Sequence, residues 1–389
     1  MKRRAYPSEK IFQIILITAI GLSFIFTIFQ NIFRYTPDYW QRFPHLKERY
    51  LDSQYATKKP TQGWISDAAA YAYTGGALIT GMNPVLVVPD APPLGKYLIG
   101  LSAVIFNNEH VFTVIFAFLS LILLFLVGVQ VLQNKTLALI PPAFWSAEPL
   151  FRDQISHGPL FDIFQLVFLL CMIYFFNKGH AASERREVVI SFILLFVFLG
   201  LFIATKYFVS GLIMIAAGSL VLILRKQFKK LFYFISLIPL SVLILLATYS
   251  RVFAFGYDVK ELLGIQKWIF LYHKSQFILP FSIWPLVFLN QWHVWFGDMP
   301  VIPDEAWFFT WPIITGLSFL TIVLYILRKI KHRAELEILL SWTFFFFFFF
   351  SFGQIFSRYL IIVIPVMYII SIYSLREFAL AYAKRKKQK

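Results

Sequence analysis

Long apolar runs constrain this chain more than any other feature of its sequence. Several approach the roughly 20 residues that a helix needs to cross the hydrocarbon core of a bilayer. The chain holds 59% hydrophobic and 14% charged residues, whereas a soluble domain would carry about a quarter charged residues. The alternating pattern of an outer-membrane barrel is absent. The sequence therefore predicts an all-α polytopic membrane protein.

We expect about ten transmembrane helices. Two long segments between them, 34–110 and 250–306, contain apolar stretches that are too short to cross or are broken by proline. Such stretches suit helices that lie at the membrane interface or re-enter the bundle. The predicted spans, of which the third is short, are 11–33, 111–132, 136–150, 162–177, 188–204, 207–224, 231–249, 307–327, 336–352 and 359–375.

Basic residues fix the orientation of these spans. Most of the 36 Lys and Arg residues fall in short blocks between spans or in the tail KRKKQK, and such blocks stay cytoplasmic. The pattern predicts a multi-pass cell-membrane protein with both termini cytoplasmic and both long loops extracytoplasmic. Residues 1–375 form the membrane module, and 376–389 form a basic cytoplasmic tail. The net charge of +16 thus reflects topology, and nucleic acid is not expected as a partner.

Ionisable residues are almost absent from the span interiors. Because charge at membrane depth is costly, their positions are informative. An ion-coupled transporter usually carries such groups near the midplane and often shows internal repeats, and neither feature is present. We therefore expect any chemistry at the outer edge, where these residues lie near a span boundary: Glu148, Arg152, Asp153, His157, Asp162, Lys206 and Arg358.

The segment 66–96 carries the strongest local signals. Asp67 follows Ser66 at a predicted helix start, and Tyr71, four residues on, should share its face. Pro92-Pro93 predicts an extended stretch and then a turn, through Lys96, into the apolar run 97–106. Each signal has a purely structural alternative. Asp67 and Asp162 could be helix caps, and the long basic side chains of Lys96, Lys206 and Arg358 could reach from apolar surroundings to water.

Taken in order, these residues resemble the polyprenyl-phosphate-sugar glycosyltransferases of the GT-C superfamily. The similarity is greatest to the protein O-mannosyltransferases of family 39 and their bacterial relatives, including the aminoarabinose transferases. It covers about residues 1–375. The matching motifs are Asp67 with Tyr71, Pro92-Pro93-Leu94-Gly95-Lys96, Asp162, Gly200 to Lys206, and Arg358-Tyr359 with Pro365.

The resemblance implies a reaction and roles for individual residues. It implies transfer of a mannose-like hexose from a polyprenyl-phosphate donor to a hydroxyl, with inversion and with Asp67 as the general base. Asp162 would orient the acceptor or stabilise the transition state. The acceptor could be a protein, a glycolipid or a cell-wall glycan. Without the soluble domain that several relatives carry, a bacterial or archaeal plasma membrane is expected. The residues implied to bind substrate are Tyr71, Lys96, His157, Lys206, Arg358 and Tyr359, with Lys96, Lys206 and Arg358 as candidates to neutralise the lipid phosphate.

Two alternatives remain open at the level of the sequence. A lipid-phosphate flippase or carrier could use the same basic residues without chemistry, although it would not need Asp67. The two carboxylates could also hold a divalent metal, although no cofactor is required by the sequence.

Overall fold

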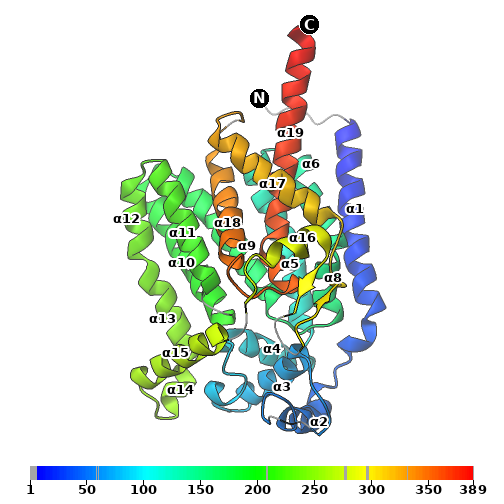
Figure 1. Cartoon of the computed structure of the whole chain (residues 1–389), viewed down its shortest axis with the longest axis vertical. Helices are drawn as coiled ribbons and strands as arrows, with labels where there is room; N and C mark the ends of the chain where they lie inside the picture. The colour runs from blue at the N-terminus through cyan, green and yellow to red at the C-terminus, as the bar shows by residue number, and fades with distance from the viewer. Residues whose placement is uncertain are drawn as a thin grey trace.

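The computed structural model describes residues 7–57, 59, 61–206, 209–275, 278–294, 298–330 and 332–388. It is an elongated helical bundle (Figure 1). The first described helix begins, and the last one ends, at the same end of this bundle, and helices α2 to α4 cover the opposite end. This arrangement agrees with an even number of crossings between the two termini.

Within the described residues, six helices are long and apolar enough to cross a membrane. Three shorter helices of the bundle, α11 (Val209–Leu224), α17 (Thr310–Ile326) and α18 (Ala334–Phe350), accompany them. The fold is thus all-α and rich in apolar helices. The six are α1 (Pro7–Gln30), α5 (Val111–Leu132), α9 (Asp162–Ala181), α10 (Arg185–Thr205), the α12–α13 pair (Phe228–Ser236 and Ile238–Thr248) and α19 (Ile364–Gln388).

Proline breaks the segment predicted as the third span. The prediction of a continuous helix over 136–150 is wrong. The chain instead forms α6 (Lys135–Ala138), α7 (Ile140–Ala147) and α8 (Pro149–Ser156). Proline lacks an amide hydrogen and is tolerated only in the first turn of a helix, so Pro141 and Pro149 each mark a new start.

Helix α9 is the most buried of the six long helices. It packs against α5 and α10, and α10 packs in turn against α13. A central helix must be apolar on all sides, and α9 is apolar on every face except at its ends. Its first residue, Asp162, therefore stands at the end of the core, where the bundle meets α3 and α4.

The first long loop folds into a compact layer. It contains η1 (Ile32–Tyr35), α2 (Tyr39–Leu51), α3 (Asp67–Ile79), η2 (Pro84–Leu86) and α4 (Pro93–Phe106). Helices α3 and α4 touch through glycine, since a Cβ on Gly100 would lie 2.3 Å from the Gly75 carbonyl oxygen. The Tyr39 hydroxyl donates to the Ala72 carbonyl at 2.7 Å, which fixes α2 on α3.

The second long loop holds α14 (Ser250–Ala254), α15 (Val259–Ser275) and α16 (Ile283–Leu289). A two-stranded antiparallel hairpin, β1 (Trp292–His293) and β2 (Val301–Ile302), follows and was not expected from the sequence. The Arg251 guanidinium donates to the Leu78 carbonyl near the end of α3, so the two long loops are joined. The short helix η3 (Ser357–Ile362) then leads into α19.

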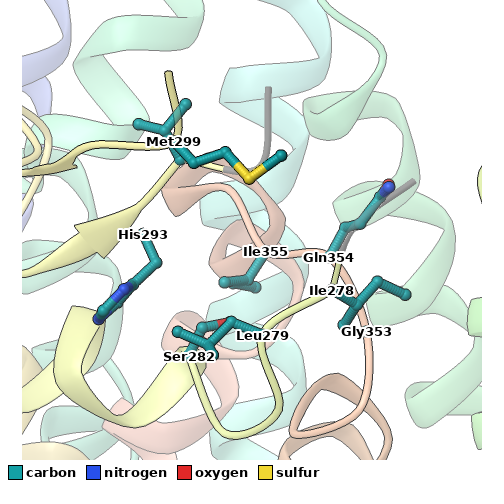
Figure 2. Close-up of a pocket in the computed structure, with 9 residues that line it drawn as sticks. Ile278, Leu279, Ser282, His293, Met299, Gly353, Gln354 and Ile355 are labelled. Carbon is teal, nitrogen blue, oxygen red and sulfur yellow. The ribbon is translucent and has the colours of Figure 1, made fainter. Parts of the chain in front are cut away.

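A small cavity of about 120 Å³ lies between α16, the hairpin and the segment before η3 (Figure 2). The Trp292 indole donates to the Ile355 carbonyl at 2.9 Å, and the Trp284 indole donates to the Ser351 hydroxyl at 3.0 Å. These bonds hold the segment that precedes Arg358. The lining contains no residue predicted for the site: Ile278, Leu279, Ser282, His293, Val294, Met299, Gly353, Gln354 and Ile355.

Candidate active site

Asp67 is the first residue of α3, and two partners bind its carboxylate. The preceding Ser66 caps the helix by accepting from the Ala69 amide at 3.3 Å. The Tyr55 hydroxyl donates to Oδ1 of Asp67, and the Arg358 guanidinium forms an ion pair with Oδ2. The Asp67 side chain is still 30% exposed. The carboxylate is therefore firmly oriented but remains within reach of a further group.

A second ion pair joins Asp162 and Lys206. Asp162 begins α9, and Lys206 is the residue that ends α10. Because α9 and α10 pack side by side, the start of one and the end of the other lie at the same end of the bundle. The Asp162 side chain is only 4% exposed and that of Lys206 is 18% exposed. Charges so poorly hydrated need a partner, and here each one has it.

The ring of Tyr359 links the two ion pairs. The Lys206 ammonium lies 4.2 Å from the ring centroid, and the Arg358 guanidinium carbon lies 5.9 Å from it. Lys206 also interacts electrostatically with Asp67, and Arg358 with Asp162. The structure thus brings five predicted residues, from four separate segments, into one cluster of two anions, two cations and a phenol: Asp67, Asp162, Lys206, Arg358 and Tyr359.

The electrostatics of this cluster favour an ionised Asp67. Its burial raises the pKa of the carboxyl group, but the Arg358 charge, the hydrogen bonds from Tyr55 and Arg358, and the more distant Lys206 lower it. The net effect is a pKa below the ordinary value of an aspartate. Asp67 is therefore a carboxylate, and hence a proton acceptor, at neutral pH.

Tyr71 lies one turn along α3 from Asp67 and is 7% exposed. Its ring stacks on Phe161, with centroids 3.8 Å apart and an interplanar angle of 21°. Phe161 directly precedes Asp162 and also lies against Gly95, where a Cβ would come within 2.5 Å of the Phe161 ring. The Tyr71–Phe161 stack therefore couples the two helices that carry the two carboxylates.

Lys96 does not join the cluster. Its side chain is fully buried, and its ammonium donates to the carbonyl oxygens of Val87 at 3.2 Å and Val88 at 2.6 Å. Burial lowers the pKa of Lys96 from 10.5 to about 8, and Asp90 opposes that effect. In this structure Lys96 anchors the loop before α4. Its assignment as a phosphate ligand stays a prediction.

His157 lies at the edge of the cluster. It ends α8, its side chain is 69% exposed, and its Nδ1 is 2.6 Å from Oδ1 of Asp153. Asp153 interacts electrostatically with Asp162 and Arg358. His157 is thus connected to the cluster through Asp153, and a role in binding the donor stays a prediction.

Sequence reasoning missed Tyr55. It lies 12 positions before Asp67 in a segment that has no hydrophobic period, and it belongs to none of the matched motifs.

Glu148 lies outside the cluster. It is fully buried and accepts hydrogen bonds from the Trp311 indole at 2.5 Å and the Tyr368 hydroxyl at 3.2 Å inside the bundle. Among the residues that the structure describes, no three His, Cys, Asp or Glu side chains cluster in a way that could hold a metal ion.

The sequence matches no protein-family model and no curated protein. Its fold is similar to that of ArnT from Cupriavidus metallidurans. Against the crystal structure bound to undecaprenyl phosphate, the TM-score is 0.58 at 15% identity, over 91% of this chain and 61% of that one. Against the apo crystal structure, the TM-score is 0.56 at 16% identity, over 80% and 55% of the two chains.

A third similarity is to the apo crystal structure of the Archaeoglobus fulgidus oligosaccharyltransferase, with a TM-score of 0.48 at 15% identity over 96% of this chain and 52% of that one. This chain thus spans just over half to about three fifths of the length of these proteins. At such identity the similarity to ArnT concerns the fold alone.

Proposed function

We propose that this chain is a membrane glycosyltransferase that takes a hexose from a polyprenyl-phosphate donor. The sugar would pass, with inversion, to a hydroxyl group of a protein, a glycolipid or a cell-wall glycan. The reaction would take place on the extracytoplasmic side of the cell membrane, where the predicted orientation puts Asp67. Residues 1–375 would form the catalytic module, and 376–389 would be a cytoplasmic tail.

The observation that carries this proposal is the pairing of two carboxylates with two cations around Tyr359. A phosphodiester needs cationic hydrogen-bond donors, and Lys206 and Arg358 supply them. An attacking hydroxyl needs an ionised carboxylate within reach to accept its proton. The pKa of Asp67 is lowered and its side chain is 30% exposed, so Asp67 meets both requirements. The similarity in fold to ArnT, which has been crystallised with undecaprenyl phosphate, supports the same donor class.

The mechanism follows from these positions. The donor phosphate binds Arg358 and Lys206, and this releases Oδ2 of Asp67 from its ion pair with Arg358. The acceptor oxygen then attacks the anomeric carbon as the bond from that carbon to the phosphate oxygen breaks. The electron pair of that bond goes to the phosphate, and the acceptor proton goes to Asp67. Both cations would stabilise the charge that develops on the leaving phosphate.

The remaining candidates take supporting roles in this proposal. Asp162, released by Lys206, would orient the acceptor or stabilise positive charge on the sugar. Tyr71 and Tyr359 would border the donor. His157 would meet the phosphate from the side of α8, and Lys96 would do so only if it left the carbonyl oxygens of Val87 and Val88.

A transfer assay tests the proposal directly. Purified protein in nanodiscs is incubated with a labelled polyprenyl-phosphate hexose and membrane extracts as the source of acceptor. We expect release of polyprenyl phosphate together with label in the acceptor. Loss of a general base costs on the order of 100- to 10,000-fold, so Asp67→Asn should lower turnover at least roughly 100-fold without loss of folded protein.

Asp258→Asn is the matched control, because Asp258 is exposed and only caps α15. Its turnover should equal that of the wild type. Movement of the labelled lipid between leaflets with no release of polyprenyl phosphate would instead identify a flippase or carrier. Near-normal transfer by Asp67→Asn would exclude Asp67 as the base.

A further inference from the structure

The segment after α2 holds the segment before α3 through the side chains of Asp52 and Gln54. The Asp52 carboxylate accepts from the Thr61 amide at 3.0 Å, from the Thr61 hydroxyl at 2.8 Å and from the Gln62 amide at 2.6 Å. The Gln54 amide pairs with both backbone groups of Ile65, at 2.6 and 3.0 Å. The chain is therefore fixed two residues before Asp67.

Tyr55 follows Gln54, and its ring is fixed as well. It stacks on Tyr50, with centroids 6.2 Å apart and an interplanar angle of 13°. Tyr50 packs in turn on Tyr73 of α3, with centroids 4.6 Å apart, and its hydroxyl accepts from the Val88 amide at 3.2 Å. Because Tyr55 stacks on this anchored ring and donates its hydroxyl to Asp67, its phenol has little freedom to leave the carboxylate.

We propose that Tyr55 is the positioning residue for Asp67. Its hydroxyl occupies Oδ1, so that Oδ2, the oxygen bound by Arg358, is the one that accepts the acceptor proton once a phosphate has drawn Arg358 away. This inference rests on the proposed function. It assigns a different role to each carboxylate oxygen, and it gives a purpose to a tyrosine outside every matched motif.

The position of Tyr55 also affects the basicity of Asp67. A hydrogen bond donated to a carboxylate stabilises its charged form, so loss of the Tyr55 hydroxyl raises the pKa of Asp67. Arg358 acts in the same direction and would still be present. The other titratable or charged groups around this site come from α3, α9, the end of α10, η3 and the loop before α4: Tyr71, Asp162, Lys206, Tyr359 and Asp90.

The test compares Tyr55→Phe with Tyr50→Phe, which removes a hydroxyl from the same aromatic row without touching Asp67. The protonated carboxyl band of Asp67, identified by its loss in Asp67→Asn, is followed by infrared spectroscopy as a function of pH. We expect Tyr55→Phe to move the midpoint upward by about one pH unit, and Tyr50→Phe to leave it in place. In the transfer assay, Tyr55→Phe should lower kcat by about tenfold with little change in the KM for the donor.

A variant with the same shape covers the case in which Tyr55→Phe does not fold. Difluorotyrosine at position 55 is a stronger hydrogen-bond donor, so it should move the Asp67 midpoint downward. An unchanged midpoint in Tyr55→Phe and with difluorotyrosine, or an equal shift in Tyr50→Phe, would overturn the assignment. The infrared titration needs no turnover. Absence of transfer by the wild-type protein would therefore overturn the proposed function separately.

Discussion

The Arg358 guanidinium pairs with the Asp67 carboxylate although 291 positions separate the two residues. One lies at the start of α3 and the other in η3, just before the last helix. The pair therefore joins the first long loop to the segment before the last helix, at the end of the bundle that α2 to α4 cover. It also means that the proposed base is occupied until another anion competes for Arg358.

This competition predicts two different acid limbs in the pH dependence of transfer. In the free enzyme Arg358 and Tyr55 outweigh burial and lower the pKa of Asp67, so kcat/KM should stay high until the pH falls below the ordinary aspartate range, about 3.9. With phosphate on Arg358, the pKa of Asp67 rises. The acid limb of kcat should thus lie at higher pH than that of kcat/KM, since kcat reports the enzyme–substrate complex. Coincident acid limbs for kcat and kcat/KM would mean that Arg358 stays paired with Asp67 after the donor binds.

Arg358→Lys should weaken donor binding more than it affects folding. The planar fork of arginine offers two parallel donors to the oxygens of a phosphate, whereas a lysine ammonium is a single compact donor. We expect a KM for the donor about tenfold higher, with kcat less affected. Steady-state kinetics at varied donor concentration measure both. The conservative change at an exposed cation, Lys260→Arg, should leave both constants unchanged.

The pair formed by Asp162 and Lys206 should appear in a double-mutant cycle of stability. Removing one partner leaves the other poorly hydrated and unpaired, which we expect to cost about 3–5 kcal/mol at this largely buried pair. Asp162→Asn or Lys206→Met alone should therefore lower the Tm in detergent. The double variant should recover most of that loss in stability, whereas transfer should be low in all three variants. A double variant as unstable as the two losses combined would show that the pair is not coupled.

Gly95→Ala should disrupt the packing of Phe161, the residue that precedes Asp162. A Cβ at this position would lie 2.5 Å from the Phe161 ring, which is fully buried and stacks on Tyr71. Overpacking of this kind costs typically about 1–3 kcal/mol and would shift Asp162 as well, so Tm and kcat should both fall. The control is Gly21→Ala in α1, where a Cβ meets nothing within 4 Å; it should keep both values.

Lys96→Met should change how stability depends on pH. Burial lowers the pKa of Lys96 from 10.5 to about 8, so the unfolded chain binds its proton more tightly than the folded protein does. The wild type should accordingly gain stability as the pH rises from about 8 to 10.5, because the penalty for burying the charged form disappears. The Tm difference between Lys96→Met and wild type should change over this window and remain constant below it.

The sequence predicted much of this fold because its strongest signals are local. The helix start at Asp67 appears as predicted, although Ser66 rather than Asp67 supplies the cap. Pro92 is extended as expected, but α4 begins at Pro93, several residues before the predicted apolar run. The broken segment around Pro141 and Pro149 was misjudged, because apolar composition outweighed the effect of proline on backbone hydrogen bonding. The ion pairs of Asp67 and Asp162 and the contact of Tyr55 with Asp67 depend on packing between distant segments. No single position in the sequence records such packing.

The two ion pairs have a consequence for the energetics of turnover. Asp67, Asp162, Lys206 and Arg358 carry charges that cancel, so the empty site is neutral and the donor diester adds one negative charge. When the sugar leaves, the phosphate gains a second negative charge while the acceptor proton neutralises Asp67. The total charge of the site is therefore the same before and after the bond breaks. Displacing an elementary charge across the whole bilayer is worth about 2.3 kcal/mol per 100 mV, whereas this chemical step moves one negative charge only from Asp67 to the phosphate within the same site. Its rate should therefore respond only weakly to the membrane potential.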